Sequence, residues 1–354
     1  MKLLTRIIVL ILITAFITLP CSAADGEEGV SVLDAEELDA LLQPLIEKYE
    51  LNDSNFGLAF LYTGTNERYF INGDEYFFGA SLFKVPLCML VAEKVSSGEL
   101  TQDSIFSNVP VTIIEERCII ASNNGFAANI YSALGSEVDE LLVSYSGIDY
   151  EDIPESGHKH NYSPRLMLNT LQTLYEDPER FPNIIECMLR TQPEHYFRQT
   201  LEGRYDVAQK YGQYGGTLNN AGIIYTPTPI ILVVMTEFVY GGMDLIGELA
   251  ELFADYSLTM DKRIAEHEAR LAAEEEARLE AERKAAEEAE RQRLAAEEQA
   301  RLAEEQRIAE EQRMAAEKAA EEAAQQRRRL ILSVAGGIAL SGAAVLFILL
   351  KRRK

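Results

Sequence analysis

Residues 79–86 read Gly-Ala-Ser-Leu-Phe-Lys-Val-Pro, and an apolar helical run follows them through Val95. Ser81 and Lys84 are three residues apart in this stretch, so on a helix they share one face. A lysine that has lost its proton can take the proton of a neighbouring serine and turn a weak hydroxyl into a nucleophile. Ser-x-x-Lys alone arises by chance in most chains of this length, so its meaning depends on the rest of the sequence.

Two other short motifs follow along the chain. Residues 122–124 read Ser-Asn-Asn after a predicted helical run over 111–121, and residues 210–212 read Lys-Tyr-Gly at the start of a predicted strand. This trio, in this order, resembles the Ser-x-x-Lys, Ser-Asp-Asn and Lys-Thr-Gly motifs of the class A serine β-lactamases and penicillin-binding proteins. The likeness runs from about Leu33 to Leu258. The segments that carry it are 79–86, 120–129, 207–212, 220–225 and 229–236.

Apolar periodicity in the same region predicts an α+β domain. The predicted elements are, in order, a helix over 34–49, strands over 57–62 and 68–71, a mostly helical middle, strands over 221–225 and 230–236, and a helix over 245–254. This layout predicts one antiparallel sheet. The resemblance implies the β-lactamase/transpeptidase fold, with helices on both sides of that sheet.

The resemblance also implies a role for each motif residue. Ser81 would be the acylated nucleophile, Lys84 its activating base, and Ser122 the group that passes a proton to the leaving nitrogen. Asn124 would hold the side-chain amide of the substrate, and Lys210 would supply positive potential for the substrate carboxylate.

The third motif continues the predicted substrate-binding set through Tyr211, Gly212 and Gln213. The backbone N–H groups of Ser81 and Gln213 would form the oxyanion hole, where one preorganised donor stabilises the transition state by roughly 3–4 kcal/mol. Tyr211 departs from the family, which has a small Thr or Ser where the substrate carboxylate binds. The resemblance implies neither a metal nor another cofactor.

A second departure concerns the loop over 147–163. Class A β-lactamases keep a glutamate there that deacylates the enzyme through a water molecule. This loop contains Glu151 and Glu155 but lacks the Glu-x-x-Leu-Asn pattern of the family. Without that base, a β-lactam would acylate Ser81 and remain attached.

These observations favour an exported serine acyl-enzyme whose substrate is a β-lactam or a D-alanyl-D-alanine peptide of the cell wall. The missing loop pattern favours penicillin-binding or carboxypeptidase-like behaviour over an efficient β-lactamase. The alternative is a degenerate member that binds wall peptide or a protein partner without turnover, and Tyr211 is its best support. A third reading is a surface adhesion or spacer module.

The charge of the 354-residue chain, −24 in total, is concentrated in the same region. Residues 25–260 contain 37 acidic and 12 basic residues, whereas residues 261–329 contain 20 acidic and 15 basic residues. Nucleic-acid binding needs a basic face that displaces counterions from phosphates. The acidic block therefore argues against a nucleic-acid partner.

Both ends of the chain carry apolar segments. A basic start, an apolar core and small residues predict a signal peptide over 1–24, with an uncleaved anchor as the alternative. Residues 330–350 lack charge and are long enough to span a bilayer as a helix. The chain would then be a single-pass protein of the cell membrane. The domain over 25–257 would lie outside the cell, and the basic residues 351–354 would lie in the cytosol.

Residues 258–329 contain neither Gly nor Pro and consist mainly of strong helix formers. Large apolar residues recur near heptad spacing, but only about once in two turns, so a charged single helix and a weak coiled coil both remain open. Glu precedes Arg by four residues, as at Glu274 and Arg278. The predicted role is a spacer, with self-association through this helix or the membrane segment as a further option.

The remaining candidates for chemistry have simpler interpretations. Cys88, Cys118 and Cys187 lie in apolar stretches and are predicted to be buried thiols. His158 and His160 lie near acidic residues, but a polar surface loop is a simpler interpretation than a metal site. His195 precedes the third motif, where a surface or packing role is favoured over a place in the cleft.

Overall fold

The computed structural model describes residues 31–106, 108–135, 138–157, 160–192 and 195–351, except for the side chains of 106, 337–345 and 347–351. The chain divides into two compact units, residues 1–269 and 270–354. The predicted signal peptide, residues 1–24, lies outside the described residues.

The first unit is built on one antiparallel sheet in the order β2-β1-β9-β8-β7. Its strands are β1 (Phe56–Tyr62), β2 (Glu67–Ile71), β7 (Val207–Tyr214), β8 (Thr217–Ile224) and β9 (Ile230–Thr236). In the centre, β1 pairs with β9 from Phe56 opposite Thr236 to Tyr62 opposite Ile230. The predicted α+β class and antiparallel sheet are confirmed, and the third motif lies within edge strand β7 rather than at its start.

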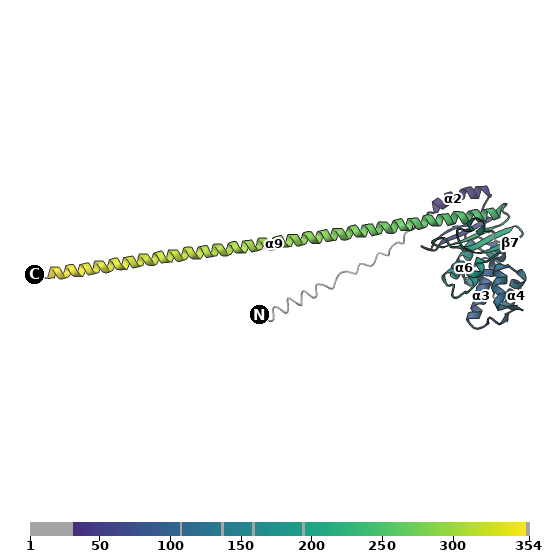
Figure 1. Cartoon of the computed structure of the whole chain (residues 1–354), viewed down its shortest axis with the longest axis horizontal. Helices are drawn as coiled ribbons and strands as arrows, with labels where there is room; N and C mark the ends of the chain where they lie inside the picture. Colours follow the sequence, from purple (N-terminus) through teal and green to yellow (C-terminus); the bar gives the residue numbers. More distant parts are fainter. Residues whose placement is uncertain (1–30, 107, 136–137, 158–159, 193–194, 352–354) are drawn as a thin grey trace. The chain divides into compact units, whose positions relative to one another are not determined.

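Helices cover both faces of the sheet (Figure 1). Side chains of β1 alternate between two cores: Leu61 packs with α3 (Lys84–Ser96) and α6 (Pro164–Glu176), whereas Phe60 packs with α2 (Ala35–Lys48) and the beginning of α9. Because both faces are covered, every residue of β1 and β9 is buried. α3 is itself buried from Lys84 to Ala92, which makes it the central helix of its layer.

Short segments connect these layers and place the site. The helical ones are η1 (Ala80–Phe83), η2 (Val111–Ile113), η3 (Glu116–Ile120), α4 (Asn124–Leu134), α5 (Val138–Ser144), η4 (Tyr150–Asp152), η5 (Glu155–Gly157), α7 (Ile184–Leu189) and α8 (Arg198–Leu201). Two small ladders accompany them: β3 (Phe77–Phe78) with β6 (Asn161–Tyr162), and β4 (Ile105–Phe106) with β5 (Val109–Pro110). The run predicted as one helix over 111–121 is therefore divided, and η3 within it is a π-helix.

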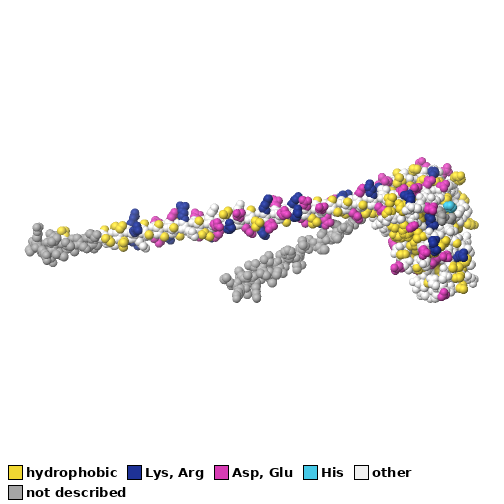
Figure 2. Space-filling model, viewed as in Figure 1, with side chains coloured by type: hydrophobic (Ala, Val, Ile, Leu, Met, Phe, Trp, Pro, Cys, Tyr) yellow, Lys and Arg dark blue, Asp and Glu magenta, His cyan; other side chains and the backbone are white. Residues whose placement is uncertain are grey.

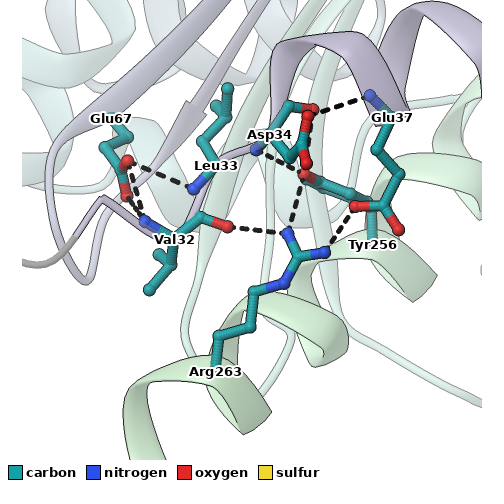
Figure 3. Close-up of polar contacts among 7 residues, drawn as sticks. All are labelled: Val32, Leu33, Asp34, Glu37, Glu67, Tyr256 and Arg263. Atoms are coloured by element: carbon teal, nitrogen blue, oxygen red, sulfur yellow. Dashed lines mark hydrogen bonds and ion pairs between the residues drawn. The ribbon is translucent and has the colours of Figure 1, made fainter. Parts of the chain in front are cut away.

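Polar contacts fix the first described residues to the sheet and to α9 (Figure 3). The Glu67 carboxylate accepts hydrogen bonds from the backbone N–H groups of Val32 and Leu33, at 3.0 and 3.1 Å. Arg263 on α9 donates to the Val32 carbonyl at 2.8 Å and to the Glu37 carboxylate at 2.6 Å. Residues 32–37 are thus part of the folded domain.

The last helix, α9 (Gly242–Lys351), begins in the first unit and forms the described part of the second. The predicted closing helix and the predicted charged helix are one uninterrupted helix. Residues 270–336 are all exposed, and Figure 2 shows basic and acidic side chains interspersed along this stretch. The recorded ion pairs often have Arg before Glu, as in Arg278–Glu282 at 4.0 Å and Arg301–Glu305 at 3.8 Å, the reverse of the predicted order.

The predicted membrane-spanning segment, residues 330–350, forms the end of α9, and most of its side chains lie outside the described residues. Among the described residues, no helix is both long enough and apolar enough to cross a membrane.

Candidate active site

Ser81 lies in a strained turn at the entrance to the central helix. Ala80 has φ 48°, in the left-handed region that side-chain-bearing residues rarely adopt, and η1 leads directly into α3 at Lys84. The turn is held from outside, because the backbone N–H of Gly79 donates to the His160 carbonyl at 2.9 Å. Such strain persists only where the surroundings enforce it, and it clusters at functional sites.

Lys84 is the centre of the polar cluster and is fully buried. Its Nζ lies 3.0 Å from Ser81 Oγ, 2.7 Å from the Ser122 carbonyl oxygen, 3.2 Å from Ser122 Oγ and 2.7 Å from Asn124 Oδ1. Burial in the helical layer disfavours the ammonium form and lowers the pKa of Lys84 to about 8. At pH 7 about a tenth of the molecules therefore hold this lysine as a neutral amine, and at pH 8 about half.

The geometry directs the lone pair of the neutral amine at the serine. A neutral amine has two N–H donors and one lone pair, and a carbonyl or amide oxygen can only accept. The two shortest contacts, to the Ser122 carbonyl and Asn124 Oδ1, therefore take the two N–H groups. The lone pair then remains for a hydroxyl, and Ser81 Oγ at 3.0 Å is nearer than Ser122 Oγ at 3.2 Å. This is the arrangement that a general base requires.

Ser122 is brought into the cluster by an irregular backbone. The π-helix η3 precedes it, its own φ is 49°, and the N–H of Asn123 returns to the Arg117 carbonyl at 2.8 Å. Asn123 then caps α4, because its side chain accepts from the Phe126 N–H at 3.1 Å. The result places Ser122 Oγ between two amines, 3.2 Å from Lys84 Nζ and 3.0 Å from Lys210 Nζ.

Lys210 faces the same hydroxyl from strand β7 and is also fully buried. Its Nζ donates to Ser122 Oγ at 3.0 Å and to the Tyr211 carbonyl at 2.8 Å. Burial, and secondarily the charge of Lys84, hold the pKa of Lys210 well below its usual range. A lower pKa reduces the share of charged Lys210 and hence the positive potential that the predicted role requires.

The ring of Tyr211 covers this lysine. Lys210 Nζ lies 4.1 Å from the centre of the Tyr211 ring, which stacks on Tyr196 with centroids 5.0 Å apart and planes at 19°. The buried Tyr196 donates its hydroxyl hydrogen to Gln213 Oε1 at 3.3 Å. The sequence did not point to Tyr196, because it lies 15 residues before Tyr211 and belongs to no motif.

Gly212 allows β7 to pass close to the serine turn. A Cβ at this position would lie 2.5 Å from the Gly79 carbonyl oxygen and 3.2 Å from the Ser81 nitrogen. The two predicted oxyanion donors, the N–H groups of Ser81 and Gln213, therefore belong to elements in direct contact. Only a glycine fits between them without displacement of the backbone.

In the described part of the loop before α6, the carboxylates make no hydrogen bond to the cluster. Glu151 and Glu155 are exposed, and within the described residues no hydrogen bond joins either of them to Ser81 or Lys84. His160, at the end of this loop, packs its ring against Phe83 and Tyr131, with centroids 4.5 and 4.7 Å away. His158 lies outside the described residues.

The remaining candidates add no hydrogen bond to the cluster among the described residues, although Cys88 and Cys118 are close enough to influence the pKa of Lys84. His195 is exposed, and its carbonyl accepts from Gln209 Nε2 at 2.9 Å. Cys88, Cys118 and Cys187 are buried free thiols, which confirms the predicted burial. No group of three or more metal-binding side chains occurs among the residues described in the structure.

Comparison with known proteins supports the resemblance. Solved structures that share the fold include an ancestral class A β-lactamase (GNCA), 22% identical with a TM-score of 0.52, over 62% of this chain and 99% of that one. The protein PBP-A is 18% identical with a TM-score of 0.53, over 62% and 96% of the chains. A β-lactamase from Xanthomonas campestris pv. campestris is 18% identical with a TM-score of 0.52, over 62% and 97%.

No curated protein sequence matches the chain. The family described as the beta-lactamase enzyme family matches residues 36–108 and 119–257, more than half of the length. These residues include the whole polar cluster. The chain therefore belongs to the beta-lactamase enzyme family.

Proposed function

We propose that this protein is a serine acyl-enzyme whose nucleophile is Ser81 and whose substrate is a β-lactam or a D-alanyl-D-alanine peptide. The observation that carries the proposal is the contact set of Lys84. Its two shortest contacts are to oxygens that can only accept, so its lone pair faces Ser81 Oγ at 3.0 Å. Lysine in this environment can act as a base at neutral pH because burial has lowered its pKa to about 8.

The contacts support a complete proton route. Ser81 Oγ attacks the carbonyl carbon of the substrate while its proton moves to Lys84 Nζ. When the tetrahedral intermediate collapses, the carbon–nitrogen bond breaks and the leaving nitrogen takes a proton from Ser122 Oγ. Lys84 Nζ then returns its proton to Ser122 over 3.2 Å, which leaves an acyl ester on Ser81 and a neutral lysine. Water hydrolyses the ester in a second step.

The second step should be slow for a β-lactam. The described carboxylates of the loop before α6, on Glu151 and Glu155, are exposed and make no hydrogen bond to the cluster. A water molecule near the ester would lack the base that class A enzymes use for deacylation. The proposal is therefore a penicillin-binding or carboxypeptidase-like protein with a long-lived penicilloyl adduct.

Covalent labelling tests the proposal. The full-length chain is incubated with a fluorescent penicillin at high concentration, and label is measured after denaturing electrophoresis and by intact mass. Label is expected on the wild type and on Ser156→Ala, an exposed loop serine, and none on Ser81→Ala. A lifetime of hours supports a penicillin-binding protein, and one of seconds indicates a β-lactamase. Absence of label on a folded wild type would sink the proposal.

Tyr211 supports a second candidate, a member that binds wall peptide or a protein partner without turnover. The ring occupies the place of a small hydroxyl and covers Lys210 Nζ at 4.1 Å. Binding of a cell-wall peptide that is unchanged by Ser81→Ala, together with absent labelling, would favour this candidate.

We propose, from the sequence alone, that the domain is exported and held at the cell membrane by residues 330–350. The support is the signal-peptide pattern of residues 1–24 and the 21 uncharged residues near the C-terminus. Protease treatment of intact cells would degrade an exported domain and spare an internal one. Recovery in the membrane fraction, lost on removal of residues 330–354, would identify the anchor.

A further inference from the structure

The amine of Lys210, in the polar cluster, is already occupied by protein groups. Lys210 Nζ is directed at Ser122 Oγ and the Tyr211 carbonyl, and the Tyr211 ring lies over it at 4.1 Å. Two amines share the Ser122 hydroxyl, so both cannot carry a charge there without strong repulsion. The pKa of Lys210 is accordingly held well below its usual range by burial and by Lys84.

Arg198, one of the described arginines, is engaged by backbone carbonyls. The Arg198 guanidinium donates to the carbonyls of Met188, Thr191 and Val207, at 2.7, 2.5 and 2.9 Å. Arg117 lies 5.8 Å from the centre of the Phe126 ring. The surrounding block of residues 25–260 carries 37 acidic against 12 basic residues. An anion that enters here would lose its hydration next to a lysine whose amine is already bound to Ser122 and Tyr211, which is costly.

The ring itself is fixed. Tyr211 stacks on Tyr196, a side chain with no exposed surface, and Tyr196 is in turn tied to Gln213 by its hydroxyl group. The stack therefore holds an aromatic side chain beside Lys210, where the family resemblance implies a small hydroxyl. An aromatic side chain at this place favours a neutral or apolar group over an anion.

We propose that Tyr211 makes this cleft select acyl donors whose leaving group carries no negative charge, such as an ester, an amide or an internal peptide bond. The inference rests on the proposed acyl-enzyme function and orders its substrates by charge, with uncharged donors ahead of the anionic β-lactams and D-alanyl-D-alanine peptides. Donors that end in a free carboxylate, penicillins among them, would still acylate Ser81, but slowly. Tyr211 acts here as a specificity-determining residue and not as a catalytic one.

Two thioesters that differ only in this charge test the inference. The pair is an N-acyl-D-alanyl thioester of thioglycolic acid and the methyl ester of the same compound. In both, the Ser81 Oγ–carbon bond forms, the carbon–sulfur bond breaks, and the thiol leaves with the proton that Ser81 gave up. Thiol release by the full-length protein is measured for each donor. Each rate is divided by the rate of that donor with hydroxide, which corrects for leaving-group reactivity.

The corrected ester-to-acid ratio should be at least 10 for the wild type. Tyr211→Thr should lower it by about tenfold, and Tyr211→Phe, which keeps the ring, should leave it unchanged. Tyr214→Thr is the matched control, since it makes the same change on the same strand at a side chain that is 72% exposed. Tyr211→Phe also preserves the stack, so its ratio is informative even if Tyr211→Thr fails to fold.

The outcomes separate the two levels of the proposal. A wild-type ratio near or below 1, with acylation of Ser81 by both donors, overturns the inference and leaves the acyl-enzyme function standing. A high ratio that Tyr211→Thr, shown to be folded, does not change overturns the role of Tyr211. If neither donor acylates the folded wild type or folded Tyr211→Thr, the result contradicts the proposed function and, with it, the inference.

Discussion

The two units of the molecule place lysine in opposite environments. In the first, Lys84 Nζ lies 2.7 Å from Asn124 Oδ1 and the lysine is fully buried. In the second, Lys284 Nζ lies 2.7 Å from Glu280 Oε1, and the two side chains are 67% and 53% exposed. Water screens the exposed pair, so this ion pair contributes little to stability. At the same contact distance, burial lowers the pKa of Lys84 in the first unit, whereas Lys284 in the second unit is a solvated surface residue.

The largest expected effect on the acylation rate comes from replacing each lysine in turn. Lys84→Met should reduce the rate of Ser81 acylation by roughly a thousandfold, because general-base catalysis typically contributes 10²–10⁴-fold. Lys284→Met, the matched change in the second unit, should leave the rate unchanged. Stopped-time labelling with fluorescent penicillin measures both. Comparable losses in the two variants would break the comparison.

The pH dependence of acylation should follow the buried amine. Lys84 must be unprotonated to accept the serine proton, and its pKa is about 8. The rate should therefore rise about tenfold per pH unit between pH 6 and 7, rise more slowly through pH 8 and level off above it. Labelling rates across this range provide the measurement. A rate that is flat or falls as pH rises would show that Lys84 is not the base.

Glycine offers a third contrast between the units. Gly212→Ala should reduce acylation by about tenfold, because displacements near 1 Å at a reacting centre are costly. The added Cβ would lie 2.5 Å from the Gly79 carbonyl oxygen. Gly336→Ala in α9, where nothing lies within 4 Å, is the control and should have no effect. Thermal unfolding should show a lower melting temperature for Gly212→Ala only, and equal melting temperatures would contradict the tight contact.

The smallest expected effect comes from exposed charge. Raising salt from 20 to 200 mM should speed labelling by an anionic penicillin about two- to threefold, since salt screens repulsion from the acidic block. Residues 25–260 have a net charge of −25. The uncharged methyl ester donor should respond little. A penicillin rate that falls steeply with salt would imply an attractive cation in the cleft.

Much of the fold could be predicted from the sequence because apolar periodicity reports burial directly. The runs over 57–62 and 230–236 became the central strands β1 and β9, and the run after Ser81 became the central helix α3. The chemistry-bearing side chains Ser81, Lys84, Ser122 and Lys210 lie in one cluster. The order of the three motifs in the sequence predicted this cluster, although the backbone conformation around it was not predicted.

The rest depends on contacts between distant segments. The left-handed conformations of Ala80 and Ser122 follow from packing around the turn and from the π-helix η3, which no local preference indicates. Stacking of Tyr196 on Tyr211 requires the segment before α8 to meet β7. The burial of Lys210 beside Lys84 has the same origin, since it is a property of the folded state.

The contacts around the beginning of α9 have a mechanical consequence. Tyr62 donates to Asp261 at 2.5 Å, Lys48 pairs with Glu248 at 2.7 Å, and Arg263 reaches Glu37. These bonds are spaced along the helix and join it to β1 and α2, segments some 200 residues away in the sequence. Tension applied at residue 269 along the axis of α9 would load these three contacts together, in shear. They would not break one after another. The start of α9 is therefore built to bear a pulling force without peeling away from the domain.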